Sequence, residues 1–439
     1  MSYTVKAILN MEVAPALGCT EPVAIALGAA AAATLLPEKT FDTLEIWVDP
    51  NIYKNGLAVS IPGTNGLTGI DTAAVIGALG GDARLKLEVL ETITDEVVAK
   101  ATEFLKAGKV KVNLLADHQG LYIKTVLQSG QDRAESVIQY LHDNIVSLKL
   151  NGQENTASEL LQKGSGSGDK ISLLELESWL KDLSLADLLE MVDNLDDEDK
   201  KFLAEGIRFN MQLAEHGLKH GQGLGVGKTL ERLARQGLIK KDMIHEARIL
   251  ASAAADARMS GVKLPAMSSA GSGNHGLTAI LPIKAVYDFV DCDYNTLLEA
   301  ICLSHIVTAY IKAHTGRLSA VCGCSIAAGA GAAAGVTYLM AGNIHHIAGA
   351  IKNLAEDLAG VICDGAKAGC AFKLATAAGT AVQAALFSLH GVNVLPSDGI
   401  IGDSPEQTMQ NIGTLSTQGM IETDRTILKI MLEKQFSGY

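Results

Sequence analysis

The sequence has few aromatic residues and no surplus of positive charge. Aromatic side chains make up only 4% of the 439 residues, and 36 Lys and Arg residues face 49 Asp and Glu residues, which gives a formal net charge of −13. Such a chain lacks the basic surface that neutralises phosphates, which disfavours a nucleic-acid partner. It has instead 44 Gly residues and long Ala-rich stretches. Small side chains let helices approach closely, so we expect tightly packed helices.

The usual signs of export are also missing. Met1–Lys6 shows no basic segment followed by an apolar core, so we expect no secretory signal. Seven cysteines, an odd number in a long chain, do not make a disulfide scaffold, which favours a reducing, cytoplasmic location. The four cysteines from Cys322 to Cys370 are then metal ligands, catalytic thiols or small buried side chains.

Acidic and basic residues are absent from residues 318–351. Ala and Gly dominate this stretch, and both favour membrane insertion far less than Leu or Ile. We therefore expect a buried helix in a soluble core and no membrane association.

The first 150 residues have a mixed pattern. Residues 13–36 are Ala-rich and helical in pattern, and residues 83–107 have helical periodicity. Short apolar or alternating runs predict strands at five places: 44–50, 57–63, 109–115, 121–127 and 144–150. Helices and strands together predict a mixed α/β domain here.

The remainder of the chain changes character twice. Residues 151–205 contain the flexible segment Gly164–Gly168 and the acidic run Asp193–Asp199, which we interpret as a linker and a solvated helix end. From about residue 206 the pattern is almost wholly helical. The predicted fold class is therefore α+β, with a mixed domain at 1–150, a linker and acidic helical segment at 151–205, and an Ala/Gly-rich helical catalytic domain at 206–439.

Cys322, Cys324, Cys363 and Cys370 are the first candidate site. Thiolates are soft ligands that suit iron–sulfur clusters and zinc, and the glycines between Cys363 and Cys370 allow a turn that aims both sulfurs at one cluster. Cysteine is also among the most buried residue types, so buried core thiols explain the spacing equally well.

The segment Pro15–Pro22 is the second candidate. Thr20 is a plausible N-cap with Pro22 in the first turn of the following helix. Cys19 would then lie near a helix N-terminus, where a thiolate is stabilised and can act as a base or nucleophile. The alternative is a buried cysteine beside a cap.

Ser268–Gly276 is a third candidate, because a run of small residues before a helix exposes backbone N–H groups that can bind a carboxylate. The alternative is a structural turn. Four side chains there could contact a substrate: Ser269, Ser272, Asn274 and His275.

Basic and amide side chains elsewhere could also hold a carboxylate. Asn51 and Lys54 lie in the donor-rich segment Asp49–Gly56, and Arg258 or Arg317 could bind a carboxylate through two hydrogen bonds. A plain turn and structural ion pairs are the alternatives.

Taken in order, these segments resemble the L-cysteine desulfidase-like family, also called UPF0597, which is related to the α part of the iron–sulfur L-serine dehydratases. The resemblance runs from Pro15–Pro22 to Glu422–Arg425, with only residues 151–205 loosely matched. It implies that three cysteines, Cys322, Cys363 and Cys370, hold a 4Fe–4S cluster with one open iron, Cys324 being the rival for the first position. It further implies that Cys19 is the proton acceptor and that Ser268–Gly276 binds the substrate carboxylate.

The expected activity is therefore a 4Fe–4S-dependent α,β-elimination on a small amino acid. L-Cysteine, giving pyruvate, ammonia and hydrogen sulfide, is the first choice of substrate, and L-serine is the alternative. A non-catalytic iron–sulfur binding or sensing protein is the alternative from another class. The scheme does not require pyridoxal phosphate, and the sequence is compatible with a homo-oligomer.

Overall fold

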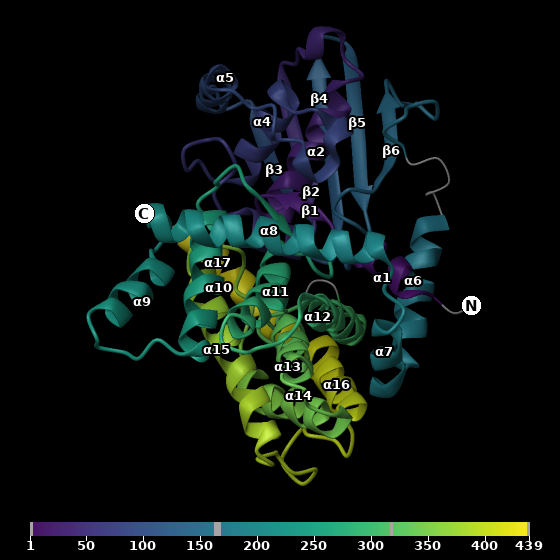
Figure 1. Cartoon of the computed structure of the whole chain (residues 1–439). Coiled ribbons are helices and arrows are strands. Elements are labelled where there is room, and N and C mark those ends of the chain that lie inside the picture. Colours follow the sequence, from purple (N-terminus) through teal and green to yellow (C-terminus); the bar gives the residue numbers. More distant parts are fainter. Residues whose placement is uncertain (1–2, 162–167, 317–318, 437–439) are drawn as a thin grey trace.

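The computed structural model describes residues 3–161, 168–316 and 319–436, so most of the Gly164–Gly168 segment and Arg317 lie outside the described residues. Figure 1 shows a part built on a β-sheet above a larger part made of helices. The predicted α+β class is confirmed, with a mixed sheet in the N-terminal region and a mostly helical C-terminal region.

A six-stranded sheet organises the first part, in the order β3-β2-β4-β5-β6-β7. The strands are β2 (Thr43–Val48), β3 (Val110–Leu114), β4 (Tyr122–Ser129), β5 (Asp132–Gln139), β6 (Ile145–Leu150) and β7 (Gln153–Glu154). β2 and β3 are parallel, and the other neighbours are antiparallel. Four of the five predicted strands are thus confirmed.

The predicted strand at 57–63 is wrong. Val59 and Ile61 are buried, as the apolar pattern suggested, but no neighbouring strand pairs with this segment, which folds into a loop. Conversely, β5 was not predicted, because its sequence is rich in polar residues. Its buried positions are small or apolar, and the Ser136 hydroxyl donates to the Gly28 carbonyl oxygen at 2.7 Å.

Helices cover the sheet and complete this part. They are α2 (Thr20–Ala33), η1 (Pro37–Lys39), α3 (Pro50–Gly56), α4 (Ile70–Gly80), η2 (Ala83–Glu88) and α5 (Asp95–Lys106). Every residue of α2 is buried, which explains its run of Ala residues: nothing larger fits between the sheet and α4.

The helical part has its own hydrophobic core. Its helices are α6 (Gly168–Lys181), α7 (Leu185–Val192), α8 (Asp197–His220), α9 (Val226–Arg235), α10 (Met243–Met259), α11 (Gly273–Tyr287), α12 (Tyr294–Thr315), α13 (Ala327–Leu339), α14 (Ile344–Leu358), α15 (Cys370–Leu389), α16 (Pro405–Thr414), η3 (Leu415–Gly419) and α17 (Ile421–Phe436). The acidic run is a helix end, as predicted, since Asp196 caps α8.

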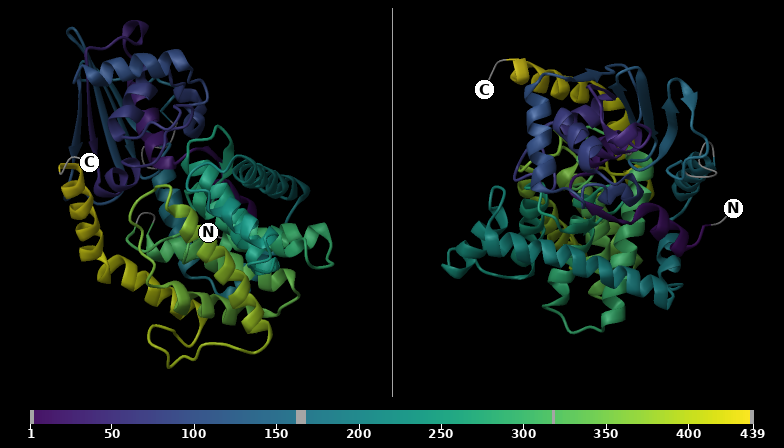
Figure 2. Two further views of the ribbon diagram at one scale, coloured as in Figure 1. Left: turned by 90° about the vertical axis from the view of Figure 1, so that its left-hand side faces the viewer. Right: turned by 90° about the horizontal axis from the view of Figure 1, so that it is seen from above.

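Both ends of the chain connect the two parts. α1 (Val5–Glu12) belongs to the core of the helical part, and β1 (Pro15–Leu17) pairs antiparallel with β8 (Pro265–Met267). At the other end, Figure 2 shows α17 running from the helical part alongside the sheet part. The region between the two parts is therefore fixed by strand pairing and by a terminal helix.

Two helices, α12 and α15, are long and apolar enough to cross a membrane by length and composition alone. Most of the apolar window of each is buried by the rest of the protein, 89% for α12 and 61% for α15. This is the pattern of core helices. Residues 319–351, within the charge-free stretch, form the 13-residue buried helix α13, the start of α14 and the connecting segments.

Candidate active site

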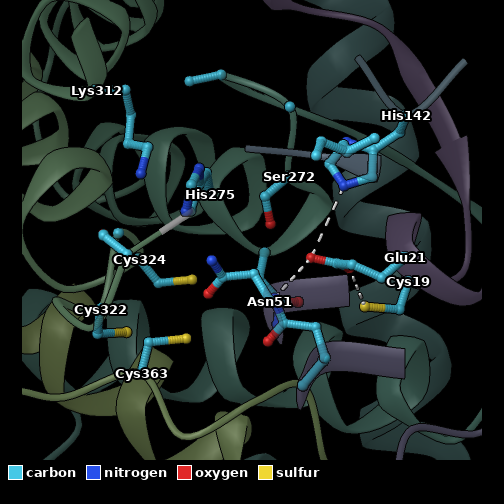
Figure 3. Close-up of a pocket in the computed structure, with 18 of the residues that line it drawn as sticks. Cys19, Glu21, Asn51, His142, Ser272, His275, Lys312, Cys322, Cys324 and Cys363 are labelled. Atoms are coloured by element: carbon cyan, nitrogen blue, oxygen red, sulfur yellow. Dashed lines mark hydrogen bonds and ion pairs between the residues drawn. The ribbon is translucent and has the colours of Figure 1, made fainter. Parts of the chain in front are cut away.

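A cavity of about 380 Å³ lies where the two parts meet. The sheet part contributes residues from the starts of α2 and α3 and from the turn between β5 and β6. The helical part contributes the cysteine-bearing segments and the loop before α11. Figure 3 shows the cysteines Cys322, Cys324 and Cys363 on one side of the cavity, facing Cys19, Glu21 and His142 on the other.

Backbone pairing brings the cysteines together. Residues Val321 and Ile362 form an antiparallel bridge. Beside it, the Cys322 amide donates to the Val361 carbonyl oxygen at 2.9 Å, and the Cys363 amide donates to the Ala320 carbonyl oxygen at 2.6 Å. Cys370 is the first residue of α15 and faces the same cavity. Cys322 and Cys363 are far apart in sequence, and they meet because the loop before α13 pairs with the loop before α15.

Cys324 belongs to the same group. All cysteines of the described residues are free thiols. The neighbouring Cys324 thiol lowers the pKa of Cys322, and Cys322, together with burial, raises the pKa of Cys324. Burial and the neighbouring Cys322 raise the pKa of Cys363, while Lys54 and Lys373 oppose the rise.

The sulfurs of this wall are candidate ligands for a metal ion or a cluster. No three His, Cys, Asp or Glu side chains within the described ranges are placed to hold one metal ion together. In a four-iron cluster each thiolate binds a different iron, so its ligands stand farther apart than those of one ion. Four soft sulfurs at one cavity, with Lys373 also lining it, are a donor set suited to an anionic cluster.

The facing wall begins at Cys19. The predicted N-cap, Thr20, is wrong, because α2 is capped by Cys19. The Cys19 side chain makes no capping hydrogen bond. Gly18 before it has a φ of +77°, and a Cβ there would lie 2.2 Å from Pro62 Cγ. Only glycine therefore allows the sharp turn that directs Cys19 into the cavity.

Glu21 is the partner of the Cys19 thiol. The Cys19 Sγ donates to Glu21 Oε2 at 3.1 Å. Burial, followed by the Glu21 charge, raises the pKa of Cys19 well above its usual value, so Cys19 rests as a thiol and not as the thiolate that its helix-end position had suggested. Burial would also raise the pKa of Glu21, but His142 and the Cys19 hydrogen bond outweigh it and keep Glu21 ionised.

The loop before α11 forms the third side of the cavity. Ser272, Asn274 and His275 line it, with Ser272 as the N-cap of α11. Ser269 does not line the cavity; its carbonyl oxygen accepts from His275 Nδ1 at 3.1 Å, and its hydroxyl contacts His305 Nδ1 at 2.9 Å.

His275 is held as a neutral imidazole. Burial and the Lys312 charge lower the pKa of His275 to about 3. Because Nδ1 carries the proton shared with Ser269, Nε2 is an acceptor, and it faces the cysteine loop: a Cβ on Gly323 would lie 2.4 Å from it. The sequence places Gly323 between Cys322 and Cys324, where no larger residue fits.

The remaining predicted residues divide into two groups. Asn51 and Arg258 line the cavity. Arg258 is 1% exposed and donates to Asn274 Oδ1 at 2.9 Å. Lys54 does not line the cavity, because its ammonium pairs with Asp424 of α17 at 2.5 Å. Arg317 lies outside the described residues.

Three polar atoms in the cavity wall are buried without a hydrogen-bond partner in the described part of the chain. They are Asn51 Oδ1, Asn55 Oδ1 and Arg258 Nε. Such atoms cost free energy unless something satisfies them, which is typical of a site that receives a polar ligand.

Sequence analysis missed Glu21, Asn55, His142, Lys312 and Lys373 as residues of this cavity. Glu21 stood in the motif that was singled out. Asn55 follows Asn51 by four positions, the spacing of one helix face, but the segment was interpreted as a turn and not as α3. His142 comes from a hairpin turn with no local signal.

Comparison with known proteins identifies the family of the chain. Residues 84–429 match the family described as serine dehydratase alpha chain. Cys19, Glu21 and Asn51 lie before residue 84 and His142 lies after it, so this match covers the cysteine wall and only part of the facing one.

Individual relatives cover the whole chain. The chain is 65% identical over 438 residues to a UPF0597 protein of Desulfatibacillum aliphaticivorans, with all of both chains covered. It is 62% identical to one of Desulfotalea psychrophila, again over all of both chains, and 44% identical to one of Clostridioides difficile, covering 97% of this chain and 98% of the relative. The chain therefore belongs to the UPF0597 family and to the serine dehydratase alpha chain family, a lyase type of enzyme.

Proposed function

We propose that this protein is an iron–sulfur lyase that eliminates the β-substituent of a small amino acid, with L-cysteine as the first candidate substrate and L-serine as the second. The observation that carries the proposal is the cavity itself: cysteine sulfurs on one wall face a thiol–carboxylate pair on the other, and unpartnered polar atoms lie between them.

Cys322, Cys363 and Cys370 would hold a 4Fe–4S cluster, with Cys324 as the alternative to Cys322. A bound cluster with an open iron supplies a Lewis acid for the leaving sulfur or oxygen, without a change of oxidation state. The position of these cysteines around one cavity and the nearby Lys373 support this assignment.

The remaining walls of the cavity would bind and orient the amino acid. Arg258 Nε and the Asn51 amide oxygen are the unpartnered donor and acceptor, suited to the carboxylate and the ammonium group respectively. The backbone at Ser272 and Gly273, at the N-terminus of α11, favours a negative charge.

Cys19 would take the α-proton from the bound amino acid. Its sulfur lies across the cavity from Cys322, Cys324 and Cys363, so one molecule between the walls can present its β-substituent to one side and its α-proton to the other. The enamine that leaves would hydrolyse in water to pyruvate and ammonia.

The test is anaerobic reconstitution with iron and sulfide, followed by measurement of pyruvate and sulfide release from L-cysteine and pyruvate release from L-serine. Cys363→Ser should lose both iron and turnover. Cys292→Ser is the matched control, because Cys292 lies in the helical part and does not line the cavity, so iron and turnover should persist. Turnover by iron-free Cys363→Ser protein would falsify the proposal.

One further candidate is a non-catalytic cluster-binding protein. It would show the iron-dependent absorbance of the reconstituted wild type but release no pyruvate from either amino acid.

A further inference from the structure

Glu21 is a buried carboxylate with an unusual set of partners. It is 8% exposed and lies in the first turn of α2. Its Oε2 accepts hydrogen bonds from Cys19 Sγ and from the Thr20 hydroxyl, each at 3.1 Å. Its Oε1 accepts from Asn55 Nδ2 at 3.1 Å and lies 3.9 Å from His142 Nε2. Figure 3 shows the contacts to Cys19 and His142 at the edge of the cavity.

A helix cap does not account for this set. An acidic residue in the first turn of a helix is stabilised by backbone N–H groups and normally stays exposed to water. Glu21 is instead enclosed: the α2 start and α3 supply its side-chain donors, and the β5–β6 turn supplies the nearby His142. Burying a carboxylate costs several kcal/mol unless donors surround it, so the fold maintains a charge here at a cost.

The Cys19 thiol has the complementary requirement. It is 4% exposed, and among the described residues its side-chain hydrogen bond is to Glu21. A thiol can act as a base only after its proton has moved to an acceptor, and Glu21 Oε2, which accepts the Cys19 hydrogen bond at 3.1 Å, is placed to take it.

We propose that Glu21 accepts the Cys19 proton, so that Cys19 and Glu21 work as one base, with Asn55 and His142 holding the carboxylate in place. This inference rests on the proposed function. It adds a proton acceptor from the same motif to a reaction for which Cys19 alone had been assigned.

The proton balance closes without a further reactant. The Cys19 S–H bond breaks, an O–H bond forms on Glu21 Oε2, and the electron pair stays on sulfur. The thiolate takes the α-proton of the amino acid, the C–H electron pair becomes the Cα=Cβ bond, and the β-substituent leaves with its own pair as HS⁻ or HO⁻. The anion takes a proton from solvent water and departs as H₂S or H₂O, and the proton held on Glu21 is released to solvent, so the proton count is restored. Cys19 is again a thiol and Glu21 again a carboxylate.

The test compares Glu21→Gln with Thr20→Val in the reconstituted enzyme. Gln keeps the shape of Glu21 and an acceptor oxygen but cannot take the proton, whereas Thr20→Val removes the other hydroxyl bonded to the same Oε2 atom. Glu21→Gln should lower kcat by about 10²- to 10⁴-fold, the range for loss of a general acid or base, with KM within about threefold. Thr20→Val removes a donor but leaves a carboxylate that can take the proton, so it should lower kcat by no more than about tenfold, and Glu21→Asp should restore part of the activity.

Two readouts separate this role from a structural one. Iron content and the cluster absorbance should be unchanged in Glu21→Gln, and the kinetic isotope effect with α-deuterated substrate should increase, because proton removal becomes the slow step. A kcat within threefold of wild type, or a loss of turnover matched by loss of iron, overturns the inference.

Two outcomes distinguish the failure of each proposal. If the wild-type enzyme turns over neither amino acid, the proposed function fails and this inference with it. If the wild type is active and Glu21→Gln is equally active, only the inference fails. Should Glu21→Gln not fold, Asn55→Ala, which leaves the carboxylate but removes a donor, should lower kcat about tenfold and raise the same isotope effect. An unchanged kcat in that variant overturns the inference.

Discussion

The two walls of the cavity are built in opposite ways. In the cysteine wall, backbone pairing between residues 320–322 and 361–363 fixes the positions, and the sulfurs have few partners besides each other. In the facing wall, side chains fix each other, since Glu21 has hydrogen bonds from Cys19, Thr20 and Asn55. A backbone-built wall leaves its side chains available to an inorganic group, and a wall of connected side chains suits the movement of protons.

The walls also differ in origin. The cysteine wall comes wholly from the helical part, within the region that matches serine dehydratase alpha chains. The facing wall comes from the first 142 residues, and it depends on how the sheet part docks. Removing a residue from one wall should therefore have a different signature from removing one from the other.

The largest expected effect is on the cysteine wall. Cys322→Ser should remove iron and reduce turnover below detection, while Cys324→Ser should keep most of the iron, because Cys322 is the predicted ligand and Cys324 the rival. Iron content and absorbance after anaerobic reconstitution measure both. If Cys324→Ser loses the iron and Cys322→Ser keeps it, the first ligand is Cys324. Loss of iron in both variants would mean that binding needs all four thiols.

On the facing wall, Cys19→Ser should lower kcat by about 10²- to 10⁴-fold and leave the iron content unchanged, because a hydroxyl is a far weaker base than a thiolate. Parallel measurement of iron and of pyruvate release checks this. Loss of iron in Cys19→Ser would show that the two walls are not separable.

Acid should destabilise the helical part through its buried histidines. Burial lowers the pKa of His305 to about 4 and, with the Lys312 charge, that of His275 to about 3. These histidines take up protons with a pKa near 6.5 in the unfolded chain but stay neutral at that pH in the folded chain. The free energy of unfolding therefore falls as the pH drops below about 6.5, by about 2 kcal/mol for each histidine at pH 5. Urea unfolding of apo-protein at pH 7 and pH 5 measures the total.

The matched variant is His305→Asn, whose amide can still contact the Ser269 hydroxyl. It should reduce the difference in unfolding free energy between pH 7 and pH 5 by about 2 kcal/mol, because one titrating group is removed.

Two tryptophans can report which part unfolds first. Trp47 lies in the sheet part and Trp179 in α6, so variants that keep one tryptophan each follow the two parts separately. An acid effect confined to the sheet part would contradict this prediction.

The smallest expected effect concerns the contact that joins the parts. Lys54 is 1% exposed and pairs with Asp424, whose side chain is 25% exposed. Asp424→Asn leaves the buried ammonium without its counter-charge and should lower the free energy of unfolding by about 2 kcal/mol. The double variant with Lys54→Met should recover most of this loss in urea unfolding, and equal stability of wild type and Asp424→Asn would refute the assignment.

Sequence patterns found elements whose signal is local. The strands β2, β3, β4 and β6 and the Ala-rich α2 followed from alternation and small side chains. The segment at 57–63 had the same alternation without a partner, and β5 had a partner without the alternation of apolar residues. Strand formation depends on a neighbour as much as on propensity, and a neighbour is not encoded locally.

The candidate site shows the same division. The residue types were evident from the sequence: cysteines with two glycines between them, a Gly-Cys-Thr-Glu segment and a small-residue loop before a helix. Their family and fold class followed from them. The tertiary structure alone decided which side chains meet, because Glu21 reaches Asn55 and His142, Lys54 contacts Asp424, and the loops of Cys322 and Cys363 pair only when separate segments pack together. Contacts between distant segments depend on packing and burial, which no single stretch of sequence contains.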